Sequence, residues 1–389
     1  MTMTATSSSS TEQATEPPAR YPNLFTPLQL GDLTLPNRVI LAPLTRCRAD
    51  LNSNVPNDLM ALYYSQRASA GLLITEYTTI KENAITFHTE GAIFNQVQVE
   101  GWKKTTEAVH AKGGLIFCQL AHGGRAAHPL NNNDQLPVAP SPIALTNKSF
   151  PQFTRFGEER FEYPAPRELS DEEVQEIVQD FKIAAQNAKD AGFDGIEIHA
   201  ANGYLINQFL CESSNQRTHG LYSGESYETR FQFLKEILEH VIEVWGKDRV
   251  GVRISPINSY QGMIHENPVE FTADVATRLN EFDIAYLHLV RGDIFGIQNG
   301  DVVTPARENF MNTLIANLGY TPEEAEQSVE EKTVDAVAFG RLFIANPDLP
   351  ERLKVGAKLN ELDGTTLYTK EAKGYTDYPF LSEEEETKE

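Results

Sequence analysis

The feature that most constrains the fold is a series of eight short apolar segments, most of them separated by a helical pattern. Several of these segments are apolar without a clean alternation, which is typical of strands covered on both faces. Eight strands that alternate with helices predict a parallel sheet closed into a (β/α)8 barrel. The predicted strands cover residues 38–42, 72–76, 115–120, 195–199, 250–254, 285–290, 313–316 and 336–339.

The clearest helical pattern begins after Ser170. Ser170 and Glu173 have the spacing of a capping box, in which each side chain accepts a hydrogen bond from the other residue's backbone N–H. Apolar residues then recur every three or four positions as far as Ala188, and Gly192 ends the pattern. This helix is predicted over 170–191, and further helices are predicted near 57–69, 101–112, 226–245, 268–281, 321–332 and 349–357.

The central part of the chain has no Gly/Ser linker and no abrupt change in charge, so we expect a single domain. Residues 1–20 are polar and predict a disordered N-terminal segment, residues 21–381 the barrel, and residues 382–389 an acidic tail. Residues 121–168 contain seven prolines and predict a long capping segment after the third strand, since connections of this length are usually functional. A doubly wound sheet is the alternative, but no GxGxxG motif follows the first strand.

The charge and composition of the chain disfavour several classes of partner and site. A formal net charge of −22 disfavours nucleic acids and anionic membranes, because both attract basic surfaces. No apolar run approaches the roughly 20 residues that span a bilayer, and no signal-peptide core is present. The three cysteines form no CxxC pair and no histidines have HExxH spacing, so we expect no metal. These features predict a cytoplasmic protein, in keeping with a reducing compartment.

Three polar residues after the fourth predicted strand carry the most informative pattern. The carboxyl ends of barrel strands form active sites, and there His199 and Asn202 can both donate hydrogen bonds to one oxygen. Tyr204 adds a neutral acid, since a phenol with its ordinary pKa of about 10 keeps its proton at neutral pH. Two donors and a proton source suit a reaction that forms an enolate. From spacing alone, an equally good interpretation is that His199 caps the strand and Tyr204 packs.

Six segments of the chain resemble, in order, motifs of the Old Yellow Enzyme family of FMN-dependent ene-reductases, and of 12-oxophytodienoate reductases in particular. The pairing of HAANGYLINQFL with GRLFIANPDL is specific to this family. The resemblance spans about 21–381 and implies a (β/α)8 barrel that binds FMN noncovalently. The matching segments are LFTPLQLGDLTLPNRVILAPLTR (24–46), GIEIHAANGYLINQFL (195–210), SSNQRT (213–218), VGVRISP (250–256), AFGRLFIANPDLPERL (338–353) and GYTDYPFL (374–381).

The resemblance implies which residues bind the flavin ring. The main chain of Pro43 and Leu44 is expected to line the ring system, and Thr45 to hydrogen-bond it near C4=O and N5. Gln119 and Arg253 are expected to contact the pyrimidine edge, where Arg253 would stabilise the negative charge of reduced flavin.

The resemblance also implies the residues that bind the FMN phosphate, and the chain departs from the family pattern at two positions near the cofactor. Gly340 and Arg341 are expected to bind the phosphate together with Gly319, since barrels commonly build phosphate sites after strands seven and eight. Tyr77 is expected close to the flavin, at a position where the family usually has Gly or Ala, so its ring either points away or narrows the O4/N5 edge of the flavin. Leu318, before Gly319, also departs from the family pattern.

For the substrate, the resemblance implies a two-step, ping-pong reduction by an NADPH dehydrogenase. NAD(P)H reduces FMN, and flavin N5 then delivers hydride to Cβ of an α,β-unsaturated carbonyl compound. His199 and Asn202 hold the carbonyl oxygen, Tyr204 protonates Cα, and Tyr368 lines the pocket. The chain has no Rossmann fingerprint, consistent with nicotinamide and enone sharing one pocket.

Two other functions remain open from the sequence. One is a flavin-binding barrel with little enone turnover, in a sensing or storage role, favoured by the bulk of Tyr77 and Leu318. The other is a flavin-free barrel hydrolase. Ala121, where many members have Trp, is expected to enlarge the pocket, so the physiological enone stays open. The preference between NADPH and NADH and the oligomeric state, monomer or homodimer, also stay open.

Overall fold

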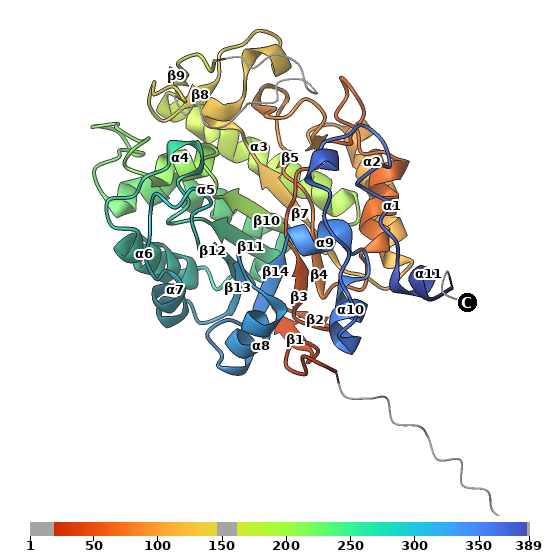
Figure 1. The fold of residues 1–389 in the computed structure, drawn as a ribbon. Coiled ribbons are helices and arrows are strands. Elements are labelled where there is room, and N and C mark those ends of the chain that lie inside the picture. The colour runs from red at the N-terminus through yellow and green to blue at the C-terminus, as the bar shows by residue number, and fades with distance from the viewer. Residues whose placement is uncertain (1–18, 146–161, 387–389) are drawn as a thin grey trace, which may run out of the picture.

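The computed structural model describes residues 19–145 and 162–386, and its central feature is a closed barrel of eight parallel strands (Figure 1). All eight predicted strands are confirmed to within two residues, and β7 pairs with β10 while β14 pairs with β3. Because no strand of this ring is left at an edge, the doubly wound alternative is wrong. In barrel order the strands are β3 (Val39–Leu41), β4 (Leu72–Ile74), β7 (Ile116–Ala121), β10 (Gly195–Ala200), β11 (Val250–Ile254), β12 (Tyr286–Val290), β13 (Thr313–Asn317) and β14 (Ala336–Phe339).

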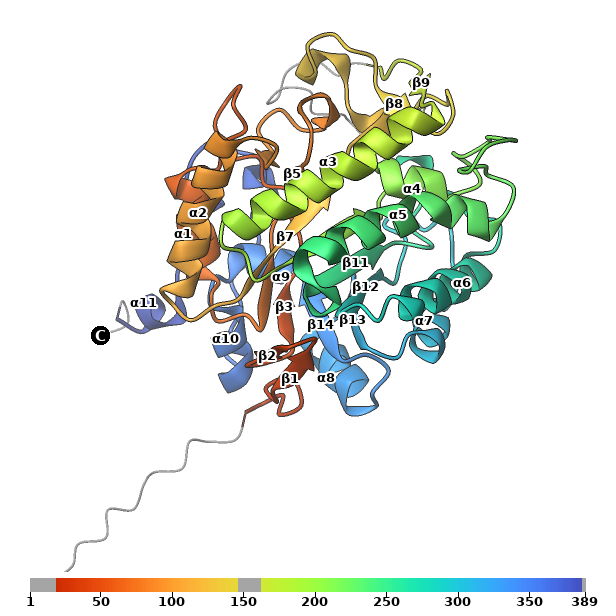
Figure 2. The same cartoon turned by 180° about the vertical axis from the view of Figure 1, so that it is seen from behind.

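Helices cover the outside of the barrel, with α3 against α5 and α1 against α2 (Figure 2). Every predicted helix is confirmed, but α2 begins at Gln96 rather than near residue 101. The reason is a capping box formed by Asn95 and Gln98, which precedes the predicted start. The helices are α1 (Asp58–Gln66), α2 (Gln96–His110), α3 (Asp171–Asp190), α4 (Leu205–Leu210), α5 (Tyr227–Trp245), α6 (Pro268–Glu281), α7 (Val303–Asn309), α8 (Pro322–Glu330), α9 (Arg341–Ala345), α10 (Leu349–Val355) and α11 (Leu381–Glu386). Among these helices, none combines the length and the apolar character needed to cross a bilayer.

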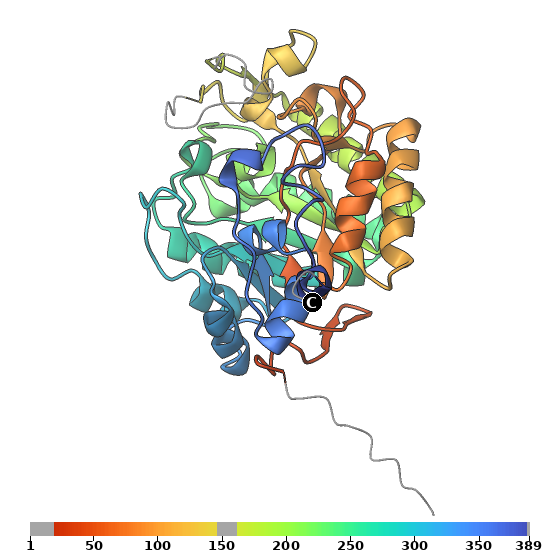
Figure 3. The same ribbon diagram turned by 45° about the vertical axis from the view of Figure 1, so that its right-hand side comes forward.

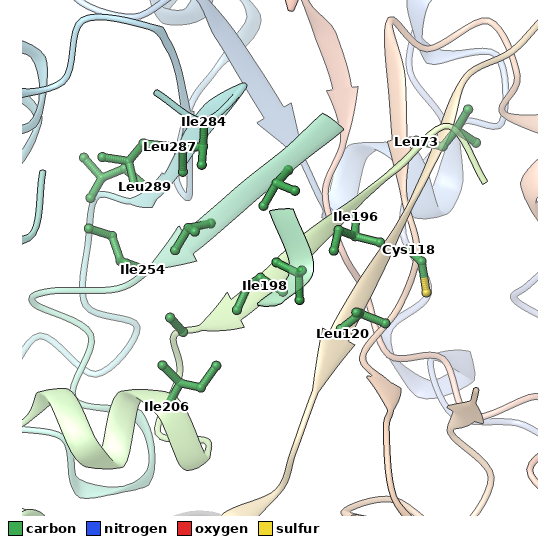
Figure 4. Close-up of a cluster of buried hydrophobic side chains, with 14 of the residues drawn as sticks. Leu73, Cys118, Leu120, Ile196, Ile198, Ile206, Ile254, Ile284, Leu287 and Leu289 are labelled. Atoms are coloured by element: carbon green, nitrogen blue, oxygen red, sulfur yellow. The ribbon is translucent and has the colours of Figure 1, made fainter. Parts of the chain in front are cut away.

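The two faces of the barrel strands carry different residues. Ile196 and Ile198 of β10 belong to the main apolar core between strands and helices, as do Ile254, Leu287 and Leu289 (Figure 4). Since side chains alternate along a strand, the residues between them point into the barrel. The inward positions of β7, β10, β11 and β12 therefore bring polar side chains together at the barrel axis.

The lower end of the barrel is closed by a short antiparallel hairpin that the sequence pattern missed. It consists of β1 (Leu28–Leu30) and β2 (Leu33–Leu35) (Figure 1). Leu30 and Leu35 are fully buried against the first residues of the strands, among them Phe117 and Ile315. This hairpin gives the lower end an apolar floor and leaves the carboxyl ends of the strands as the open end.

Short elements gather at that carboxyl end (Figure 3). The described parts of the predicted capping segment contain β8 (Val138–Ala139) and β9 (Arg167–Glu168), which pair in parallel, while β5 (Thr78–Thr79) pairs with β6 (Gly91–Ala92) and β7. After α10 the chain returns to this end, and the turn η6 (Gly364–Thr366) is held there by Arg48, whose Nη2 donates to the Thr366 carbonyl at 3.2 Å. Most of the predicted disordered segment (1–18), the middle of the capping segment (146–161) and the end of the acidic tail (387–389) lie outside the described residues.

Candidate active site

The sequence-predicted site residues gather at the carboxyl end of the barrel. All but Tyr368, which follows the turn η6, lie on a barrel strand or in the segment after one, so the closed barrel brings together segments that are far apart in the sequence. Pro43, Leu44 and Thr45 follow β3, Gln119 lies in β7, His199 in β10, Arg253 in β11, Gly319 follows β13, and Gly340 and Arg341 follow β14.

A buried polar network lies below this end, on the inward face of four strands. The Glu197 carboxylate accepts hydrogen bonds from Gln119 Nε2 at 2.7 Å, from the Tyr286 hydroxyl at 3.1 Å and from His288 Nδ1 at 2.8 Å. Arg253 Nη1 donates to His288 Nε2 at 2.7 Å. Because a guanidinium cannot accept, Nε2 is the acceptor, and the His288 proton sits on Nδ1. The chain of contacts runs from Glu197 through neutral His288 to Arg253.

Charge compensation explains how an arginine is held there. Burial lowers the pKa of Arg253 to about 10, partly offset by Glu197. Burial by itself would raise the pKa of Glu197, but His288, Arg253 and Gln119 outweigh it and lower the pKa. Burial and then Arg253 lower the pKa of His288 to about 4, so this ring is neutral at pH 7. The network therefore contains one anion and one cation, joined by a neutral imidazole.

Arg253 is also oriented from the other side, by the end of β13. Its Nη2 donates to Asn317 Oδ1 at 2.9 Å, and Asn317 Nδ2 donates to the Ala338 carbonyl at 2.6 Å. Arg253 Nε is buried and has no hydrogen-bond partner among the described residues. A buried donor without a partner is costly, so this N–H marks a place where an acceptor fits.

His199 and Asn202 present donors at the same end. Burial and then Arg253 lower the pKa of His199 to about 3, and its Nδ1 has no partner in the described part of the chain. Asn202 has a positive φ of 56°, and its backbone N–H donates to Ser255 Oγ at 2.8 Å. Asn258 Nδ2 donates to Asn202 Oδ1 at 3.0 Å, which leaves the Asn202 amide N–H groups as donors. Asn258 and Ser255 thus set the direction of Asn202.

Tyr204 lies beside His199 at the start of α4. The two ring centroids are 5.0 Å apart, and Tyr204 is 5% exposed. Burial and then Tyr260 and Tyr77 raise the pKa of Tyr204 well above 10, so its hydroxyl is protonated at pH 7. Burial raises the pKa of Tyr260 to about 12, while a hydrogen bond with Tyr204 acts in the opposite direction.

Tyr77 lies on the same side as Tyr204. Their ring centroids are 4.8 Å apart, and both belong to a small apolar cluster with Ala121 and Ala126. The Tyr77 hydroxyl donates to the Ala84 carbonyl at 3.2 Å. The bulk of this side chain packs against the Tyr204 ring.

The outer residues of the site are more exposed. Pro43, Leu44 and Thr45 are each partly exposed, and Arg341 is exposed at the start of α9. A Cβ added to Gly340 would lie 3.2 Å from Leu44 Cδ2, so a side chain at position 340 would crowd Leu44. Gly319 has a φ of +78° directly after Leu318, whose φ is +83°. Tyr368 is 43% exposed and close enough to Tyr260 to raise the pKa of that phenol, which places it at the rim.

Sequence reasoning missed Glu197, His288, Asn258 and Tyr260. A signal for the first two was present, because strands β10, β11 and β12 carry polar residues at every second position within apolar runs: Glu197 and His199, Arg253, and His288. This alternation is typical of a strand whose inner face lines a polar site. Asn258 and Tyr260 lie in the loop after β11, and no local pattern marked them.

Comparison with known proteins identifies the family of the chain. Residues 23–360 match the family model described as NADH:flavin oxidoreductase / NADH oxidase family. A probable flavin mononucleotide-dependent alkene reductase of Leishmania infantum is 46% identical over 92% of this chain and 97% of its own length. A putative 12-oxophytodienoate reductase 3 of Oryza sativa subsp. japonica is 42% identical, over 93% and 94%.

Solved structures give the same result. The old yellow enzyme of Trypanosoma cruzi superposes with a TM-score of 0.91 at 44% identity, covering 93% of this chain and all of that one. Morphinone reductase in complex with tetrahydroNAD gives a TM-score of 0.86 at 44% identity, over 92% and 97%. The predicted relationship is confirmed: the chain belongs to the NADH:flavin oxidoreductase / NADH oxidase family, on its Old Yellow Enzyme branch.

Proposed function

We propose that this chain is an FMN-dependent, NAD(P)H-driven ene-reductase in which His199, Asn202 and Tyr204 act directly on the substrate. The reaction class follows the family and its relatives, which include an alkene reductase, 12-oxophytodienoate reductases and morphinone reductase. Three observations support the residue roles: His199 Nδ1 is buried without a partner among the described residues, Asn258 occupies the Asn202 amide oxygen, and the Tyr204 phenol is protonated at pH 7. A sensing or storage role is not favoured, since these relatives are named for catalysis.

The residues present fit FMN. The unpartnered Arg253 Nε–H offers a cationic hydrogen-bond donor. The partly exposed segment from Pro43 to Thr45 offers main-chain atoms against which a flat ring can lie. Both suit the flavin ring, which is flat and carries hydrogen-bond acceptors along its edge. Gln119 and Arg253 would hold the pyrimidine edge, and Thr45 the edge near N5. Gly319, Gly340 and Arg341 would bind the phosphate, for which a guanidinium is well suited. When bound, FMN takes hydride from a nicotinamide and supplies it to Cβ of the enone.

His199 and Asn202 bind and polarise the carbonyl oxygen of the substrate. Both donate without carrying a charge, because His199 is neutral at pH 7 and an amide is uncharged. Asn258 occupies the Asn202 oxygen and so leaves the Asn202 N–H groups as donors. Neutral donors aimed at an oxygen stabilise the negative charge that develops there during reduction. Their positions are fixed in advance, by β10 for His199 and by Asn258 for Asn202, so little reorganisation accompanies the reaction.

Tyr204 supplies the proton that Cα requires. Its hydroxyl is protonated at every pH near neutrality, because burial raises its pKa. Tyr260 lies within hydrogen-bonding reach, and this contact is available to the phenolate oxygen once the proton has left. Tyr77 packs against the Tyr204 ring and keeps it in place.

We further propose that the nicotinamide and the enone use this one site in turn. Morphinone reductase has been solved with tetrahydroNAD, and the described part of this chain shows a single barrel with one polar open end. Tyr368 and the capping segment would border this shared site, with Ala121 adding room on one side. The cytoplasmic location stays a prediction.

The test separates the two half-reactions by stopped-flow absorbance of the flavin. Tyr204→Phe should leave reduction by NADPH nearly unchanged and slow reoxidation by 2-cyclohexenone by about 10²- to 10⁴-fold, the usual contribution of a positioned general acid. Tyr222→Phe is the matched control, because it removes a tyrosine hydroxyl bonded to Glu236 outside the site. An equal loss in both half-reactions would remove Tyr204 from the acid role.

A further inference from the structure

Asp293, in the loop between β12 and α7, accepts hydrogen bonds from two neighbouring loops. Its Oδ2 accepts from the backbone N–H groups of Ile297 and Gln298 at 2.8 and 2.9 Å, which closes its own loop. Its Oδ1 accepts from the Phe295 N–H at 3.1 Å. The same oxygen accepts from Ser259 in the loop after β11, from Oγ at 2.8 Å and from the N–H at 3.1 Å. One carboxylate therefore fastens the loop after β12 to the loop after β11.

The Asp293 side chain is held in its charged form. Burial would raise its pKa, but the N–H groups of Gln298 and Phe295 and the Ser259 hydroxyl outweigh burial and lower the pKa. Hydrogen bonds to a charged acceptor are roughly twice as strong as those between neutral groups. An amide of the same shape could accept at only one of its two ends, because the other end carries the NH2 group. The donors that meet at both oxygens therefore require a carboxylate at this position.

The loop after β11 lies directly against the active-site turn. Gly203 stands between Asn202 and Tyr204 in that turn. A Cβ added to Gly203 would lie 2.6 Å from Gln261 Cβ and 3.0 Å from the Tyr260 carbonyl oxygen. Because no side chain fits between the two segments, the position of the loop after β11 limits where Asn202 and Tyr204 can lie.

Two successive hydrogen bonds connect the loop after β12 to Asn202. The Ile294 N–H donates to Asn258 Oδ1 at 3.5 Å, and Asn258 Nδ2 donates to Asn202 Oδ1 at 3.0 Å. A donor at one end of the Asn258 amide assigns the oxygen to that end and the NH2 group to the other. The same assignment leaves the Asn202 NH2 group to donate to a substrate oxygen. If Asn258 were turned around, Asn202 would instead present an oxygen, which repels a carbonyl oxygen.

We propose that Asp293 is a positioning residue for the bound enone and acts by fixing the direction of the Asn202 amide. It holds Ser259 in the loop after β11, and its own loop carries the Ile294 N–H. Together these hold the Asn258 amide with its NH2 group toward Asn202. Donors that are oriented in advance stabilise developing charge without reorganisation. The inference rests on the proposed function, because it requires that Asn202 binds the substrate carbonyl.

The test measures the enone affinity of the full-length, FMN-loaded protein. Stopped-flow reoxidation of the reduced flavin by 2-cyclohexenone without oxygen, over a range of enone concentrations, gives the Kd and the limiting rate. Asp293→Asn should raise the Kd by about 10-fold, the change that one hydrogen bond typically makes. Asp301→Asn is the matched control and should bind the enone as the parent does. Its carboxylate likewise accepts from a backbone N–H and a hydroxyl, those of Val303 and Thr304 at the start of α7.

A double-mutant cycle tests whether Asp293 acts through Asn258. Asn258→Ala removes the connection, so adding Asp293→Asn should raise the Kd no further, whereas a general loosening of the loops would add to it. Asn258→Asp keeps the shape of the side chain, but a carboxylate only accepts and draws the Asn202 NH2 group to itself. It should therefore raise the Kd at least as much as Asn258→Ala. If Asn258 only filled space, Asn258→Asp would be the milder change, and this outcome would overturn the inference.

Ser259→Ala covers the case in which Asp293→Asn does not fold. It removes only the bond from the Ser259 hydroxyl to Asp293 and should raise the Kd by about 3-fold. Asn202→Ala separates the two possible failures. If Asn202→Ala leaves the Kd unchanged, the proposed role of Asn202 is wrong, and this inference is wrong with it. If Asn202→Ala raises the Kd while Asp293→Asn and Ser259→Ala do not, or if the cycle is additive, the inference alone is overturned.

Discussion

Replacing Glu197 by Gln tests the buried network that holds Arg253. The substitution keeps the shape of the side chain, and Gln119 can turn its amide to preserve a hydrogen bond. What is lost is the negative charge, which leaves the Arg253 guanidinium buried without its counter-ion; Glu197 and His288 are both fully buried. Removing one partner of a directly paired buried ion pair costs about 3–5 kcal/mol of folding free energy. Because Glu197 reaches Arg253 only through the neutral His288 ring, we expect a smaller loss for Glu197→Gln, of about 1–3 kcal/mol.

The assay is urea-induced unfolding, followed by far-UV circular dichroism at a fixed excess of FMN. Asp274→Asn is the matched control, because it breaks an i,i+4 pair with Arg278 at the surface of α6. Pairs at this i,i+4 spacing on a helix contribute about 0.3–0.5 kcal/mol. If Glu197→Gln lost no more than Asp274→Asn, the charge of Glu197 would not be what stabilises Arg253, and the reasoning would fail.

The pH dependence adds an independent check of the same prediction. The pKa of Glu197 in the folded protein is below its ordinary value of 4.5. Its contribution is therefore present above pH 4.5 and is lost as the pH falls through the folded-state pKa. The difference in unfolding free energy between parent and Glu197→Gln should accordingly be constant from pH 6 to 8 and shrink in acid.

Three further predictions concern the site and its scaffold. Because the pKa of His199 is lowered to about 3, the affinity for a neutral phenol, measured from the flavin absorbance, should be flat from pH 5 to 8; a step near pH 6.5 would contradict this. Ser170→Ala should cost about 1 kcal/mol in urea unfolding by removing the capping box of α3, and Ser170→Asp should restore most of it. Gly251→Ala should destabilise the barrel by about 1–3 kcal/mol, because its Cβ would lie 2.1 Å from the Tyr286 ring; an unchanged unfolding midpoint would refute that contact.

The positions of the strands and most helices could be predicted because local patterns specify them. The Ser170–Glu173 capping box lies in the sequence itself, and the eight apolar runs became eight barrel strands. The boundaries that were missed have local causes too: α2 starts earlier because of Asn95 and Gln98. The β1–β2 hairpin was missed since its three-residue strands are too short to show a period.

In the candidate site, too, some residues could be predicted from local sequence and others could not. His199, Asn202 and Tyr204 share one segment, so spacing and resemblance were enough to predict that they act together. Glu197, His288 and Arg253 come from three strands, and their connection depends on strand register, which pairs His199 with Arg253 and Arg253 with His288. The contact of Tyr77 with Tyr204 likewise depends on tertiary structure, since the Tyr77 hydroxyl is held by the Ala84 carbonyl.

The sequence by itself determined the fold class, the family and the residue types available for catalysis, because these depend on local periodicity and on motifs read within one segment. Only the tertiary structure decided which buried charges compensate one another, which tautomer His288 adopts, and that Arg253 is held between His288 and Asn317. Those outcomes depend on distances between side chains from distant segments, and the energy of a charge or a hydrogen bond depends on distance and on burial.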